Sequence, residues 1–193
     1  MDFIKNYIKN SIETKRNILE NEKLLSQIRD VSLVIVDSLK KGGKVLICGN
    51  GGSAADSQHI AAEFVSRFYY DRPGLPAMAL TVDTSILTAI GNDYGYEKTF
   101  SRQVQACANK DDVLIGISTS GSSQNVVNAI LEARTKGVYT IGLTGEKHGL
   151  IAEYSDTTIK IPSSETPIIQ ESHIMTGHII CAMVEKIMFP NPD

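Results

Sequence analysis

The chain of 193 residues is 42% hydrophobic and 21% charged, a balance that is typical of a folded domain and excludes an intrinsically disordered chain. Its net charge of −3 offers no basic surplus for nucleic acid or an anionic membrane, and no apolar stretch is long enough to cross a bilayer. We therefore expect one soluble domain over residues 1–193, with no nucleic-acid or membrane partner. The start of the chain shows no signal-peptide pattern, and three widely spaced cysteines are typical of buried thiols in a reducing compartment, so we expect the cytoplasm.

The first part of the chain, residues 1–41, is predicted to form N-terminal helices. Ile4, Ile8 and Ile12 repeat every four residues, which is the spacing of one helix face. A polar break at Asn21 divides the region into two helices.

The remaining region, residues 42–193, alternates short apolar runs with helical patterns. This alternation is typical of strands joined by crossover helices, so we predict a mostly parallel sheet with helices on both faces. The final helix is apolar nearly all round and should be buried, in the core or against another subunit. The predicted strands are 44–50, 76–80, 112–118, 138–143 and 157–161, and the predicted helices are 53–68, 84–90, 97–108, 122–136, 147–153 and 168–188.

A glycine loop follows the first predicted strand and reads Gly-Asn-Gly-Gly-Ser over residues 49–53. In a parallel sheet the carboxyl ends of the strands form the ligand crevice, and glycines let the backbone approach a ligand closely. Ser53 is expected to cap the next helix and to offer a hydroxyl there. Because the third glycine of the dinucleotide fingerprint is missing, the loop is either a ligand loop of another kind or an ordinary turn.

A serine loop follows the strongest predicted strand and reads Ser-Thr-Ser-Gly-Ser-Ser over residues 118–123. Its five hydroxyls lie where a helix begins and backbone N–H groups are free. We expect this loop to bind a phosphate dianion, in preference to the alternative that its serines only cap the helix.

A carboxylate and two imidazoles occur at helical spacing. His59 and Glu63 are four residues apart and share one helix face, and on the last helix Gln170 and His178 fall near one face. A His-x-x-x-Glu pair can bind a divalent metal or supply an acid and a base. Each pair is also compatible with ordinary hydrogen-bonding groups of a surface or a core.

Other polar residues receive structural interpretations. Asn92 and Asp93 are expected in a turn after a helix, where such residues are common for backbone reasons. His148 and His173 are interpreted as structural histidines.

Taken together and in order, these segments resemble the phosphoheptose isomerase family of the sugar isomerase (SIS) superfamily. The resemblance covers nearly the whole chain from the region of residue 40 onward. It rests on residues 48–53, 58–59 with Glu63, 72–77, 91–95, 116–121, and 169–173 with His178.

The resemblance implies a three-layer α/β/α fold with a five-stranded parallel sheet, and Zn²⁺ as the cofactor, one ion per subunit. It implies a homotetramer with active sites at subunit interfaces. Because the last helix is apolar on more sides than one core can cover, we predict that the glycine loop of one chain meets Gln170 or His178 of another. The implied reaction interconverts D-sedoheptulose 7-phosphate and D-glycero-D-manno-heptose 7-phosphate through an enediol(ate). This is the first step toward heptose for lipopolysaccharide, capsule or other surface glycans.

The resemblance also assigns roles to individual positions. Glu63 and His178 match the acid–base pair, and Glu63 also contacts the substrate. The positions that match a zinc site are His59, Glu63, Gln170 and His178. The positions that match the phosphate contacts are Ser53, Ser118, Thr119, Ser120 and Ser123. The positions that line the sugar are Asn50, Gly51, Gly52, Asn92, Asp93 and Gln170. Ser122 departs from the family, which commonly has Asn there.

Two other functions stay open. A close relative of the family is a non-catalytic tetramer that binds the replication initiator DnaA, and the sequence Met-Phe-Pro-Asn-Pro at 188–192 is similar to it. That relative lacks the glutamate and the final histidine, so Glu63 and His178 favour the enzyme. An isomerase for a five- or six-carbon sugar phosphate is the other alternative, because the serine loop would recognise the phosphate and not the chain length.

Overall fold

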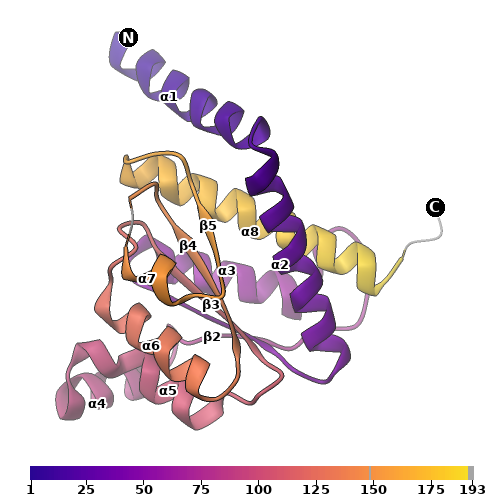
Figure 1. Cartoon of the computed structure of the whole chain (residues 1–193), viewed down its shortest axis with the longest axis vertical. Helices are drawn as coiled ribbons and strands as arrows, with labels where there is room; N and C mark the ends of the chain where they lie inside the picture. The colour runs from indigo at the N-terminus through magenta and orange to yellow at the C-terminus, as the bar shows by residue number, and fades with distance from the viewer. Residues whose placement is uncertain (148, 191–193) are drawn as a thin grey trace.

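The computed structural model describes residues 1–147 and 149–190, so His148 and the Asn191-Pro192 part of the C-terminal similarity lie outside the described residues. Strands and helices alternate as predicted (Figure 1). The strands are β1 Val45–Gly49, β2 Ala77–Ala79, β3 Val113–Ser118, β4 Tyr139–Thr144 and β5 Thr157–Lys160. The helices are α1 Asp2–Leu19, α2 Glu22–Lys40, α3 Gly52–Val65, α4 Thr84–Tyr94, the 3-10 helix η1 Tyr96–Lys98, α5 Thr99–Cys107, α6 Gln124–Thr135, α7 Leu150–Tyr154 and α8 Thr166–Met188.

The five strands form one parallel sheet in the order β2-β1-β3-β4-β5. The strand order reverses between β1 and β3, which are hydrogen-bonded neighbours with Val45 opposite Val113. A reversal of this kind opens a crevice outside the carboxyl ends of the two strands, where α/β proteins bind their ligands. The glycine loop follows β1 and the serine loop follows β3, so the topology brings both predicted ligand loops to this crevice.

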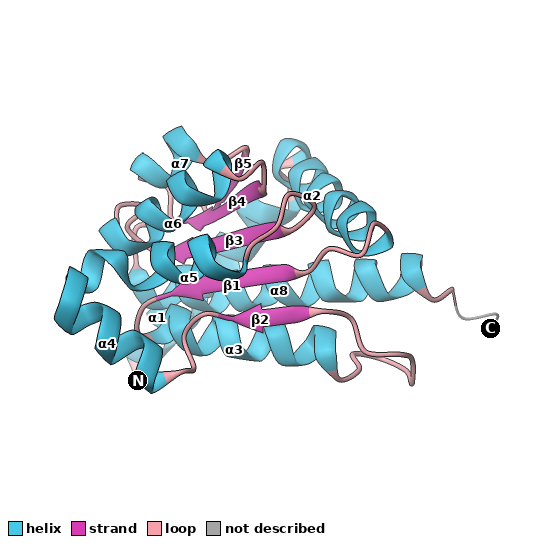
Figure 2. Ribbon diagram, turned by 90° about the horizontal axis from the view of Figure 1, so that it is seen from below, coloured by secondary structure: helices cyan, strands magenta, loops and turns pink. Residues whose placement is uncertain are grey.

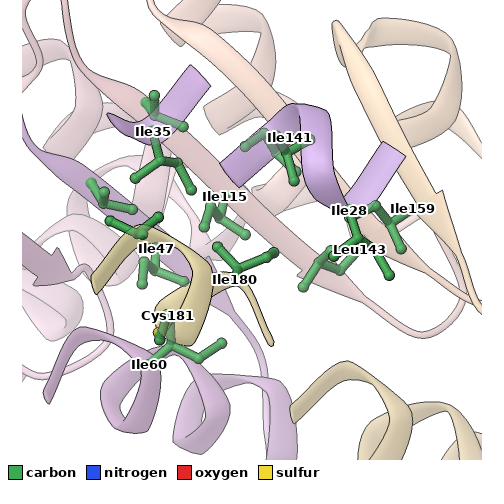
Figure 3. Packing of buried hydrophobic residues seen from close by; sticks show 14 of the residues in the cluster. Ile28, Ile35, Ile47, Ile60, Ile115, Ile141, Leu143, Ile159, Ile180 and Cys181 are labelled. Carbon is green, nitrogen blue, oxygen red and sulfur yellow. The ribbon is translucent and has the colours of Figure 1, made fainter. Parts of the chain in front are cut away.

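Hydrophobic side chains fill both faces of the sheet, because alternate residues of a strand point to opposite sides. On one face, Ile47 of β1 and Ile115 of β3 pack against α2, α3 and α8 (Figure 3). On the other face, Leu46 and Leu114 pack with residues of α5, α6 and α7, which cover that side of the sheet (Figure 2). This is the three-layer α/β/α fold that the resemblance implied.

The two N-terminal helices differ in their surroundings. Ile28 and Ile35 of α2 are almost fully buried in the core. Ile4, Ile8 and Ile12 of α1 are 57%, 52% and 52% exposed, and α1 projects from the body of the molecule (Figure 1). Because these three residues share one helix face, α1 carries an apolar stripe that a single chain leaves uncovered.

Two predicted boundaries can be compared with the structure. The break at Asn21 is confirmed, and its side chain caps α2 by accepting a hydrogen bond from the Leu24 N–H at 3.0 Å. The prediction that Asn92 and Asp93 follow a helix in a turn is wrong, because α4 continues through both residues. The helix ends at Gly95, whose φ of 89° is a conformation that favours glycine.

Helix α8 is buried against the sheet, as its apolar sequence predicts. Ile169, Ile180 and Val184 are at most 2% exposed and belong to the core. Ile179 on another face of the same helix is 37% exposed. Among the described residues, no helix is both long and apolar enough to span a bilayer.

Candidate active site

The glycine loop brings backbone to the start of α3. Gly51 is the N-cap residue with φ 58° and ψ −121°, a conformation that glycine adopts readily and other residues do not, and the helix begins at Gly52. The expectation that Ser53 caps α3 is therefore wrong. Ser53 lies in the first helical turn and is only 3% exposed, because the turn at Gly51 starts the helix before it.

The serine loop gathers its hydroxyls at the start of α6. Ser118 Oγ lies 2.9 Å from Ser123 Oγ and 3.3 Å from Ser120 Oγ. Ser123 is the N-cap residue, but its side chain makes no capping hydrogen bond, so the helix does not use this hydroxyl. Thr119 and Ser120 also line a small cavity next to the loop. Hydroxyls and free helix N–H groups at one point are suited to a dianion such as phosphate.

A pair of carboxamides that sequence reasoning missed joins the two loops. Asn50 of the glycine loop and Asn125 of α6 exchange hydrogen bonds of 2.8 Å in both directions. The Tyr96 hydroxyl donates to Asn50 Oδ1 at 2.9 Å. The sequence holds little signal for this arrangement, because an asparagine near a helix start is ordinary and the pairing spans 75 residues.

The second part of the site is a cluster in which α3 meets α8. His59 Nε2 lies 2.9 Å from His178 Nε2 and 3.3 Å from Glu63 Oε1. The ring of Phe68 lies against the His178 ring, with centroids 5.6 Å apart. The His59 side chain is 49% exposed and that of Glu63 is 22% exposed. The cluster is therefore open enough to meet a ligand or a neighbouring chain.

This cluster could hold a divalent metal ion. The ligand atoms of His59, Glu63 and His178 all lie within 4.8 Å of one another. A tetrahedral zinc ion with bonds of about 2.0–2.1 Å holds its ligand atoms about 3.3 Å apart, close to the 2.9 and 3.3 Å measured here. The same three groups can also form a hydrogen-bonded acid–base cluster without a metal.

The structure separates the other predicted residues from this cluster. Gln170 lies on α8 eight residues before His178, about 12 Å along the helix axis. Gly52 and Gln170 lie close together in one chain, since a Cβ at Gly52 would collide with the Gln170 amide nitrogen. The contact between the glycine loop and Gln170, which we predicted between two chains, therefore forms within one chain. Asn92 donates to Asp93 at 2.8 Å on the exposed end of α4, and among the described residues no hydrogen bond links this pair to the two loops.

His173 is a buried structural residue, as predicted. It is 0% exposed, and its Nε2 lies 3.1 Å from the Thr144 carbonyl oxygen. Burial lowers the pKa of His173 to about 4, and the hydrogen bond to Thr144 offsets only part of that effect. The imidazole is therefore neutral near pH 7 and donates its Nε2–H to the carbonyl.

Comparisons with known proteins agree with this arrangement of fold and loops. A family model described as "SIS domain" matches residues 6–145. The phosphoheptose isomerase of Aneurinibacillus thermoaerophilus is 57% identical to this chain, over 98% of this chain and 96% of that protein.

Two solved structures are similar over almost their whole length. The phosphoheptose isomerase of Neisseria gonorrhoeae superposes with a TM-score of 0.90 and 40% identity, covering 96% of this chain and 98% of that one. The enzyme of that name from Francisella tularensis superposes with a TM-score of 0.92 and 37% identity, covering 96% and 97%. With matching topology and 57% identity over nearly its full length, this chain belongs to the phosphoheptose isomerases of the SIS domain family.

Proposed function

We propose that this protein interconverts D-sedoheptulose 7-phosphate and D-glycero-D-manno-heptose 7-phosphate. The observation that carries the proposal is the cluster of Glu63 with two imidazoles, in a chain that belongs to the phosphoheptose isomerases. The reaction moves a proton between C1 and C2 through an enediol(ate). It needs a base near the carbon and an acid near the oxygens, and a carboxylate beside imidazoles supplies both.

The phosphate end of the substrate would be anchored at the serine loop. The converging hydroxyls of Ser118, Ser120 and Ser123 and the start of α6 support this assignment. Thr119 and Ser53, from the same two loops, would complete the phosphate contacts. The reacting end would extend toward residues that line the sugar, namely Asn50, Gly51, Gly52, Asn92, Asp93 and Gln170.

Glu63 would take the proton from one sugar carbon and return it to the next, while His178 exchanges a proton with the sugar oxygens. His59 lies within reach of both groups and would orient them. The ring of Phe68 against His178 limits the movement of that imidazole.

His59, Glu63 and His178 would hold Zn²⁺, and Gln170, about 12 Å along α8 from His178, would complete the set only from a neighbouring chain. The support for this is the spacing of the first three ligand atoms. When bound, the ion would polarise the sugar oxygens and lower the cost of negative charge on them. Glu63 has a second carboxylate oxygen, which leaves it available for proton transfer.

Distances within one chain support a homotetramer whose active sites lie between subunits. Ser53 and Glu63 lie ten residues apart on α3, about 15 Å along the helix axis. Eight bonds separate C1 of the sugar from the phosphorus, and they cover only about 9 Å when extended like a peptide backbone. A substrate anchored at the loops of one chain is thus better placed to reach the Glu63 cluster of a neighbour. The uncovered stripe on α1 and the exposed Ile179 are surfaces that such a neighbour would cover.

The product would enter heptose synthesis for a surface glycan such as lipopolysaccharide or capsule. A cytoplasmic location suits the three free cysteines, because thiols persist in a reducing compartment. No observation on the fold or the site favours the DnaA-binding alternative or a shorter sugar phosphate.

The test is incubation of the purified protein with sedoheptulose 7-phosphate, with the aldose product followed by NMR. We expect conversion to an equilibrium mixture that is also reached from the aldose. The matched substrates are fructose 6-phosphate, which tests chain length, and sedoheptulose, which tests the phosphate. Faster turnover of fructose 6-phosphate would overturn the substrate assignment, and no turnover of any of them would overturn the isomerase.

A further inference from the structure

The orientation of the Asn125 carboxamide is determined by backbone. Asn125 is 3% exposed and lies near the start of α6. Its Oδ1 accepts the Val126 N–H at 3.0 Å, and a backbone N–H can only donate. On the other side its Nδ2 faces Thr99 Oγ1 at 3.4 Å, and that hydroxyl already donates to the Tyr96 carbonyl oxygen at 2.8 Å. The Thr99 oxygen must therefore accept, so both ends of the Asn125 amide are assigned.

Asn125 in turn determines the orientation of Asn50. Asn50 Nδ2 donates to Asn125 Oδ1, and Asn125 Nδ2 donates to Asn50 Oδ1, both at 2.8 Å. The Tyr96 hydroxyl donates to the same Asn50 oxygen at 2.9 Å. A carboxamide oxygen has two lone pairs and its nitrogen two hydrogens. Both lone pairs of Asn50 Oδ1 are occupied, and the second N–H of Asn50 has no partner among the residues that the structure describes.

We propose that Asn125 and Tyr96 are positioning residues that make Asn50 present an N–H donor, and not an acceptor, to the ligand between the glycine and serine loops. Under the proposed function, on which this proposal rests, the acceptor is an oxygen of the sugar phosphate. A fixed donor is more effective than a mobile one for an oxygen that gains negative charge during the reaction, because no reorientation is needed. The same three side chains also hold the two loops at one separation.

The first test is a double-mutant cycle on turnover of sedoheptulose 7-phosphate. We expect Asn125→Ala to lower kcat/KM about tenfold and Tyr96→Phe about threefold, as for loss of one hydrogen bond that orients a group. Both act through Asn50, so neither should lower kcat/KM further in the Asn50→Ala background. Additive losses in that background would overturn the proposal.

The matched control is Asn128→Ala, one turn further along α6. Asn128 donates to the Glu97 carbonyl oxygen at 2.8 Å and has no hydrogen bond to Asn50. It should keep the wild-type kcat/KM, and a tenfold loss there would overturn the assignment to Asn50. Tyr96 is 62% exposed, so Tyr96→Phe keeps the cycle testable even where Asn125→Ala does not fold.

A second measurement does not depend on turnover. Crystal structures of the wild type, Asn125→Ala and Tyr96→Phe are compared, with inorganic phosphate binding followed by calorimetry. We expect the Asn50 carboxamide plane to rotate in Asn125→Ala, which loses both bonds of the pair, and to stay in place in Tyr96→Phe, where Asn125 still holds it. Phosphate affinity should change less than threefold in both variants, because the serine hydroxyls are intact. An unchanged Asn50 orientation in Asn125→Ala would overturn the proposal. If the wild type does not isomerise the sugar, the proposed function fails, and these structures still decide whether Asn125 positions Asn50.

Discussion

At the scale of single residues, Glu63 is the proposed base of the cluster. Glu63→Gln keeps the size of the side chain and an oxygen near His59 Nε2, which lies 3.3 Å away in the native chain, but it removes the group that accepts the proton. We expect kcat to fall by about 10²–10⁴-fold with little change in KM, the typical contribution of a general base. Glu20→Gln, the same change on the exposed end of α1, is the control. Turnover near the wild-type rate in folded Glu63→Gln would contradict the assignment.

Ser120 tests the phosphate end. Ser120→Ala removes one of the three converging hydroxyls and should weaken phosphate binding by about 1.5–3 kcal/mol, the range for a hydrogen bond to a charged group. Inorganic phosphate is titrated by calorimetry, with Ser122→Ala as the control, since Ser122 is exposed in the same loop. Equal phosphate affinity in Ser120→Ala and the wild type would exclude this hydroxyl from the anchor.

The metal is tested by removal and by substitution. We expect chelation to abolish turnover and added Zn²⁺ to restore it, while Mg²⁺ does not, because imidazole ligands suit zinc and magnesium prefers oxygen. Elemental analysis should find zinc in the wild type and none in the His59→Ala, His178→Ala double variant. Full activity after exhaustive chelation, with no zinc bound, would leave Glu63 and His178 as a metal-free pair.

At the scale of elements, a buried ion pair joins the end of α3 to α8, the two helices that carry the cluster. Glu185 of α8 is 1% exposed, and its carboxylate accepts hydrogen bonds from the N–H groups of Phe68 and Tyr69 at 2.8 and 2.7 Å. Arg72 Nε donates to it at 3.1 Å, and the Arg72 guanidinium also donates to the Glu63 carbonyl oxygen at 2.8 Å. Glu185 therefore holds the backbone of Phe68, whose ring packs on His178.

This ion pair predicts a stability that depends on pH. Burial raises the pKa of Glu185, but the hydrogen bonds from Tyr69 and Phe68 and the charge of Arg72 outweigh it, so the pKa lies below its ordinary value of 4.5. A folded-state pKa below the unfolded one means that the stabilisation is complete above pH 4.5 and is lost as the pH falls through the lower, folded-state value. We expect Glu185→Gln to cost about 3 kcal/mol at pH 7, the cost of breaking a buried pair, which lowers Tm by about 6–12 °C.

Thermal unfolding of the two proteins from pH 7 to pH 3 measures this effect. The difference in Tm should stay constant down to the region of pH 4.5 and shrink below it, since the wild type then protonates Glu185. Glu20→Gln is again the control and should show no such difference. A gap in Tm that is the same at all pH values would show that the carboxylate charge does not stabilise this junction.

At the scale of the whole molecule, the distance between the loops and the cluster predicts sites shared by two chains. We expect a tetramer in light scattering at micromolar concentration. We also expect two inactive variants to restore activity to each other. Glu63→Gln and the Ser118→Ala, Ser120→Ala double variant should each be nearly inactive alone. When they are co-expressed, mixed tetramers contain some sites with a native serine loop from one chain and a native Glu63 from another. A mixture no more active than its parts would show that each site is built within one chain.

Local patterns in the sequence were sufficient for the architecture. The apolar runs at Ile47 and Ile115 predict buried strands, and the helical spacing between them predicts crossovers, because period and burial are local properties of a chain. The parallel sheet, the break at Asn21 and the places of the glycine and serine loops after β1 and β3 were predicted on this basis and are confirmed. The end of α4 was not, because a helix boundary depends on where Gly95 takes a positive φ.

The site was predicted less completely, since it consists of contacts between distant segments. His59 and Glu63 were paired from their spacing, and the family resemblance added Gln170 and His178. The packing of α3 on α8 brings His178 to the pair within one chain. The Asn50–Asn125 pair and the Glu185 junction span 75 residues and 113 or more residues, distances over which no periodicity operates. The sequence alone determined which segments become strands, helices and the loops between them, because those preferences are local. The tertiary structure decided which side chains meet, because hydrogen bonds and metal ligands require positions accurate to a fraction of an ångström, and only the packed core supplies them.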